Sequence, residues 1–140
     1  MAEYTATALQ TVAANQNVLF TETPVCGNNS IVHREGSGII TLRGITSQCR
    51  ARFKVTFGGN ITIPSGGTVG PISITIAING EPVSSTSMIV TPAAVGQFFN
   101  VARSIYIDVP SGCCSQVSIR NTSTQSINVQ NSNLIVERVA

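Results

Sequence analysis

The sequence predicts a single all-β domain, a sandwich or barrel of about eight to ten strands. Ile, Val and Thr make up 46 of its 140 residues, and these β-branched side chains suit a pleated sheet. Lys, a good helix former, occurs once, as Lys54. Residues that favour turns recur roughly every eight to twelve positions, a spacing typical of sandwiches and barrels.

The turn signals are clusters of Gly, Pro, Asn and Ser. They lie at residues 27–29, 35–38, 58–60, 64–67, 79–80 and 110–112. The runs between the first of them predict early strands at residues 18–20, 30–33 and 39–42. Residues 1–17, rich in Ala and Thr, are an extended arm or a first strand, and residues 18–140 form the main domain.

Two segments alternate regularly between apolar and polar side chains, residues 52–57 and 72–78. This period of two predicts strands with one face buried. The residues that we expect to line the core or an interface are Phe53, Val55, Phe57, Ile72, Ile74, Ile76 and Ile78.

The second half of the chain continues the pattern. Asn79-Gly80 predicts a hairpin, with residues 83–90 returning as the next strand. Residues 99–109 predict a long strand whose apolar face is interrupted by Arg103, so this side chain lies near an end or has a partner. The remaining strands are expected around residues 117–119, 127–129 and 134–139.

The low charge bears on the partners of the chain. Charged residues are 10% of the sequence, against about 25% in an ordinary domain, and the net charge is +2. Nucleic acid is therefore not an expected partner. Arg50, Arg52 and Lys54 share one strand face, which favours a solvated face over a phosphate-binding stripe. A surface with few charges also suits subunit packing, because few charges need to be desolvated.

The sequence also bears on location. The first residues contain no basic segment followed by an apolar one, so we expect no signal peptide and synthesis in the cytoplasm. No apolar run approaches the roughly 20 residues that span a bilayer, so we expect no membrane partner. A site of action outside the cell would then be reached by lysis or by assembly into a particle.

The four cysteines are Cys26, Cys49, Cys113 and Cys114. They show no Cys-x-x-Cys spacing and no histidine cluster, so a zinc site is not expected. Two interpretations stay open. Two disulfides could tie the loops of Cys26 and Cys49 to the loop of Cys113 and Cys114, or all four could be reduced, buried thiols. In either case we expect the four to gather at one end of the sandwich.

The candidates for catalysis are few. His33 is the only histidine, so no triad or histidine metal site can form, and we interpret it as part of a polar cluster at a strand end. The acidic residues show no paired spacing and no calcium loop. We expect neither enzymatic activity nor a cofactor nor a bound metal.

Five segments carry a resemblance to a known family. They are residues 36–42 (GSGIITL), 53–57 (FKVTF), 74–80 (ITIAING), 117–121 (VSIRN) and 133–139 (NLIVERV). In this order they resemble the C1q/TNF-like jelly-roll domain of bacterial and phage surface proteins. The C-terminal domain of exosporium collagen-like proteins is similar. The resemblance implies a ten-stranded antiparallel jelly-roll sandwich that forms a tight homotrimer and has no catalytic residues.

The sequence departs from this family in two ways. It has no Gly-X-Y collagen stalk, and small or charged residues stand at 48–52, where the family has an aromatic residue. The expected function is that of a structural protein on the outside of a particle, such as a phage capsid decoration or head-fibre protein that contacts a capsid or other surface protein. The alternatives are a spore-surface protein and a carbohydrate- or receptor-binding module. Carbohydrate binding commonly uses exposed aromatic side chains, and this chain has no Trp and only two Tyr, Tyr4 and Tyr106.

Overall fold

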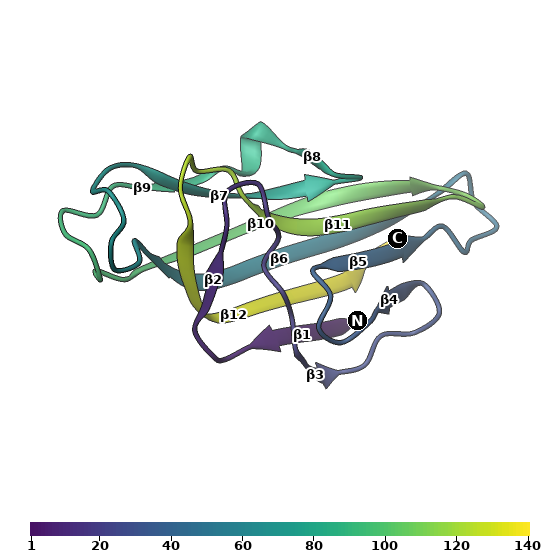
Figure 1. Cartoon of the computed structure of the whole chain (residues 1–140). Helices are drawn as coiled ribbons and strands as arrows, with labels where there is room; N and C mark the ends of the chain where they lie inside the picture. The colour runs from purple at the N-terminus through teal and green to yellow at the C-terminus, as the bar shows by residue number, and fades with distance from the viewer.

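The strands form two antiparallel sheets packed face to face, as a computed structural model of residues 1–140 shows (Figure 1). Sheet A contains, in spatial order, β10 (Phe99–Pro110), β6 (Arg50–Thr62), β12 (Ile127–Arg138), β1 (Ala2–Ala6) and β3 (Glu22–Val25), with β2 (Gln10–Val12) also paired to β12. Sheet B contains β4 (Ile31–His33), β5 (Ile39–Arg43), β11 (Cys114–Asn121), β7 (Ile72–Ile78) and β8 (Glu81–Pro82), with β9 (Met88–Val90) also paired to β7. This architecture confirms the all-β antiparallel sandwich. No helix is long and apolar enough to cross a membrane.

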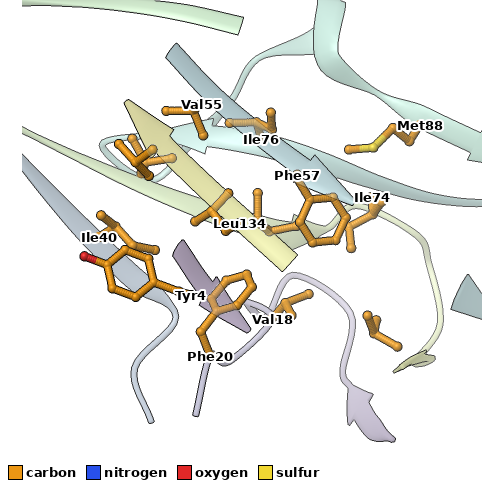
Figure 2. Packing of buried hydrophobic residues seen from close by; sticks show 14 of the residues in the cluster. Tyr4, Val18, Phe20, Ile40, Val55, Phe57, Ile74, Ile76, Met88 and Leu134 are labelled. Carbon is orange, nitrogen blue, oxygen red and sulfur yellow. The ribbon is translucent and has the colours of Figure 1, made fainter. Parts of the chain in front are cut away.

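The core lies between the sheets and contains 27 buried residues. Figure 2 shows side chains of β6 and β12, such as Phe57 and Leu134, in the same core as Ile74 and Ile76 of β7. Ile78 is half-buried and packs against this cluster. The other six residues of the expected set are at most 1% exposed: Phe53, Val55, Phe57, Ile72, Ile74 and Ile76.

Residues 1–17 contribute strands to sheet A. β1 lies between β12 and β3 with alternate side chains buried. The predicted strand at residues 18–20 is wrong, although Val18 and Phe20 are buried. The Gln10 side chain donates to the carbonyl of Leu19 (2.9 Å) and accepts from its N–H (3.0 Å). Because a side-chain amide takes both groups, Leu19 does not join a strand ladder.

The predicted turn at residues 58–60 is also wrong, because these residues continue β6. Next to them β12 bulges between Gln130 and Asn133, and Asn131 there has a φ of 54°. A Cβ on Gly59 would lie 3.4 Å from the Cα of Ser132. Gly59 thus lies directly beside the bulge. Since the bulge bends β12 without ending it, the two strands expected at 127–129 and 134–139 are one.

Asn79 and Gly80 form the expected hairpin turn, with φ values of 53° and 84°. The return does not form the single strand expected at residues 83–90. It consists of β8, the 3-10 turn η1 (Ser84–Thr86) and β9. The buried hydroxyl of Thr86 accepts from the N–H of Ile76 (3.0 Å) and donates to the carbonyl of Val83 (2.7 Å). The side chain of Thr86 therefore hydrogen-bonds the backbone at the edge of β7, where the sequence predicted a paired strand.

The sheets have one long free edge. β10 pairs with β6 over twelve residues and with no other strand, whereas the edge strands β3 and β4 have four and three residues. Arg103 lies in the middle of β10, opposite Phe57, and its Nη2 donates to the carbonyl of Ser85 in η1 (2.7 Å). Of the two expectations for Arg103, a partner is therefore the one observed.

Replacing Ile76 by Ala should lower the free energy of unfolding by about 2–5 kcal/mol, because it leaves a cavity in a packed core. Ile89 on the adjacent strand β9 is 66% exposed, and its replacement by Ala should cost less than about 0.5 kcal/mol. Chemical denaturation measures both. A cost below about 0.5 kcal/mol at Ile76 would contradict its place in the core.

Candidate functional site

The outer face of sheet A contains the strand face that the sequence predicted for Arg50, Arg52 and Lys54. Strand alternation places the polar or small residues of β6 and β10 on this side, in cross-strand pairs. Lys54 lies opposite Tyr106, Thr56 opposite Ser104, and Gly58 opposite Ala102. We call this surface, together with Arg50, Arg52 and Asp108, the β6–β10 face.

Tyr106 is the most exposed aromatic side chain on the β6–β10 face, with an exposed fraction of 65%. Beside it lies an open hollow of about 430 Å³, lined by Tyr106, Arg52, Asp108 and the chain end at Val139 and Ala140. An exposed Tyr that can bury a large area at little entropic cost is typical of the residues that dominate protein–protein contacts. The small pairs Thr56–Ser104 and Gly58–Ala102, further along the two strands, leave room for a second surface to approach.

The cationic stripe predicted on β6 is present and is partly neutralised. Asp108 accepts hydrogen bonds from Arg52 Nε (2.8 Å) and Nη2 (3.2 Å), and Arg50 Nε lies 3.3 Å from the same carboxylate. The hydrogen bond with Arg52 is the main cause that lowers the pKa of Asp108 and raises the pKa of Arg52. These groups are exposed, so their pairing contributes little stability. One carboxylate shared by two guanidinium groups weakens the stripe as a phosphate site.

The four cysteines lie at one end of the sandwich. The carbonyl of Cys49 accepts from the N–H of Ser111, and that of Cys113 accepts from the N–H of Gly44, so their two loops are in contact. Cys26 borders a hollow with Tyr4 at the same end. All four thiols are unbonded and exposed. The interpretation that they are buried fillers is therefore wrong. The two bridges are not formed in this structure and stay a prediction for oxidised protein.

His33 lies at the end of β4, in contact with aromatic residues. Its ring centroid is 4.5 Å from that of Tyr4 and 6.4 Å from that of Phe20, and Nε2 lies 2.8 Å from the carbonyl of Ser37. Burial is the main cause that raises the pKa of Tyr4. No three His, Cys, Asp or Glu side chains come together as they would around a metal ion. His33 thus packs between the sheets and the loop at residue 37.

Sequence reasoning missed a second, polar hollow on the outer face of sheet B. Its lining comes from residues 15–17, from Ile39, from the 79–80 turn and from β11. Among its lining residues, Asn79-Gly80 formed a recognisable sequence pattern, but that pattern predicted a hairpin and not a binding site. Nothing in the sequence indicated that residues 15–17 lie beside β11.

Three solved structures of low sequence identity are similar to this chain to different degrees. The globular domain of zebrafish complement 1qA protein aligns over 96% of this chain and 94% of its own length, with a TM-score of 0.55 and 12% identity. The C-terminal domain of EclA, a sugar-binding protein, aligns over 94% and 79% with a TM-score of 0.44 and 12% identity. A β-glucosidase from Paenibacillus barengoltzii aligns with 71% of this chain over 9% of its own length, with a TM-score of 0.39 and 11% identity.

No protein-family model matches the chain, and no curated protein matches it either. The alignment with the complement domain covers nearly all of both chains and shows that the fold is the C1q/TNF-like jelly roll expected from the sequence. The similarity to exosporium proteins in particular stays a prediction.

The pKa of Asp108, measured by carboxyl NMR, should lie below the usual aspartate value of about 3.9. In an Arg52→Gln variant it should rise toward that value, because the largest cause of the shift is removed. Since the folded pKa is lowered, the pairing contributes stability above the usual value, and this contribution is lost as the pH falls through the lowered pKa. Thr7→Val is the control: it should raise the pKa of Glu22, which Thr7 lowers, and leave Asp108 unchanged.

All four thiols should react with a thiol reagent in the folded, reduced protein, because all four are exposed. Mass spectrometry after brief alkylation without denaturant counts the modified residues. Protection of any of the four would contradict the exposure described here. After air oxidation, a mass loss of about two hydrogens per bridge, reversed by reductant, would show whether the thiols pair.

Proposed function

We propose that this domain is a non-enzymatic structural protein that assembles as a homotrimer and decorates the outside of a particle, namely a phage virion. The observation that carries the proposal is the β6–β10 face together with the free edge of β10. A long strand with an unpaired edge, next to a face that exposes Tyr106, favours association. The trimer is the assembly that the resemblance to C1q/TNF-like domains implies.

Several features of the β6–β10 face support association by this side. The most exposed aromatic side chain of the chain, Tyr106, lies there, and the small pairs Thr56–Ser104 and Gly58–Ala102 continue the face beyond it. Arg50 and Arg52 already share Asp108, so fewer unpaired charges have to be desolvated when the face is covered. A stable interface would bury about 800 Å² on each partner.

The particle could also be a spore, and the neighbourhood of the gene distinguishes the two. A capsid gene beside it supports the virion, and sporulation genes beside it overturn the virion in favour of the spore surface. Labelling intact particles with an antibody against the domain then tests whether it lies on the outside. Absence of label on particles that contain the protein would contradict decoration.

Light scattering at micromolar concentration should give three times the 14.6 kDa mass of one chain. Tyr106→Glu should reduce this mass to that of a monomer, because it would bury a charge in the contact. Ile89→Glu is the matched control: Ile89 is 66% exposed, against 65% for Tyr106, but lies on sheet B, and the variant should stay trimeric. A monomeric parent chain would contradict the trimer, and a trimeric Tyr106→Glu variant would contradict the face.

A further inference from the structure

The polar hollow on sheet B lies on the side of the sandwich opposite to the β6–β10 face. Its volume is about 300 Å³, which is within the range of small-ligand sites. Three outward-facing side chains of β11 line its floor: Gln116, Ser118 and Arg120. An assembly through sheet A would leave this side open to solvent.

Main-chain hydrogen bonds hold both walls of the hollow against β11. On one side, the N–H of Asn79 donates to the carbonyl of Gln116 (2.7 Å), and Asn79 Oδ1 accepts from the N–H of Gln116 (2.9 Å). On the other side, the N–H of Asn15 donates to the carbonyl of Asn121 (2.9 Å), and Asn17 pairs with Arg120 as an isolated bridge. The hollow is therefore formed by the fold itself, before any ligand arrives.

Arg120 is the only charged residue that lines the hollow, and no carboxylate neutralises it. Both salt bridges of the chain involve Asp108. Arg120 Nη1 donates to the carbonyl of Gly80 (2.8 Å), whereas its Nε is shielded from solvent and has no partner. An unpaired buried donor costs free energy. Because Nε is shielded, a ligand in the hollow would meet Nη2, which makes no hydrogen bond within the chain and can donate to a carboxylate.

The rest of the lining is neutral and hydrogen-bonding. The carboxamides of Asn15, Asn17 and Gln116 and the hydroxyl of Ser118 offer both donors and acceptors. Ile39, which is 40% exposed, adds one apolar side chain. This set matches a ligand with one negative charge and several hydroxyl groups. A polyphosphate would need more cations than one, and a purely apolar ligand would leave the amides unpaired.

We propose that this hollow binds a carboxylate-bearing sugar residue of a glycan. The ligand carboxylate lies against the guanidinium of Arg120, and its hydroxyls bond to the surrounding amides and Ser118. This inference is independent of the proposed trimer, since one chain supplies the complete site. In a trimer three copies of the site would bind a multivalent glycan more tightly than one.

NMR titration of the ¹⁵N-labelled full chain tests the proposal with four probes: glucuronate, N-acetylneuraminate, glucose and acetate. At least one acidic sugar should shift the amide signals of Asn17, Gln116 and Ser118. Glucose and acetate should each bind about tenfold more weakly, because each supplies only part of the ligand. The trimer and the site can fail separately, because light scattering reports the first and these shifts report the second.

Arg120→Gln should weaken binding of the acidic sugar by about tenfold or more, and Arg120→Lys should weaken it less, because Lys keeps the charge but not the planar guanidinium. Arg43→Gln is the matched control, since Arg43 is exposed on β5 of the same sheet outside the hollow, and it should bind like the parent. Unchanged signals from β6 in each variant show that the fold is intact. Equal binding of glucose, equal binding of acetate, full binding by folded Arg120→Gln, or no shift with either acidic sugar would overturn the proposal.

Discussion

The register of β6 is the constraint on which both sides of sheet A depend. β6 pairs with β10 over all of their shared length and with β12 on its other side, so its alternation is imposed on both neighbours. A slip by one residue would turn Phe53 outward and carry Arg52 into the core. Burial of Phe53, Val55 and Phe57 holds the register, because a slip would expose all three side chains.

The fold could be predicted where side-chain alternation decides it, as in β6 and β7. The errors arose where the backbone groups of a segment found partners that no local pattern indicates. Gly58 and Gly59 resemble a turn, but both continue β6, and Gly59 lies beside the bulge in β12. Residues 18–20 have the apolar pattern of a strand, but the side chain of Gln10 takes the groups that a ladder would use. Thr86 has the same effect in the return from the 79–80 hairpin.

The candidate sites, too, were predictable only where a local sequence pattern decides the arrangement. Spacing along one strand was enough to place Arg50, Arg52 and Lys54 on a common face. It could not show that Asp108 neutralises two of them, because Asp108 reaches Arg52 from 56 residues away. The hollow around Arg120 is less predictable still, since its walls come from three distant segments. The exposure of the cysteines was also not predictable, because composition does not reveal how the loops at their end of the sandwich are arranged.

The single long edge of β10 sets how far contacts between chains can spread. Sheets that expose two such edges can add molecules without end, as fibrils do. Here Thr86 and η1 protect the flank of β7, and the other borders are strands of three or four residues. In the proposed trimer, this edge of each chain would face the next chain, so each chain would have two neighbours. Growth would stop when the third chain closes the ring, so high local concentration would yield discrete complexes and not filaments.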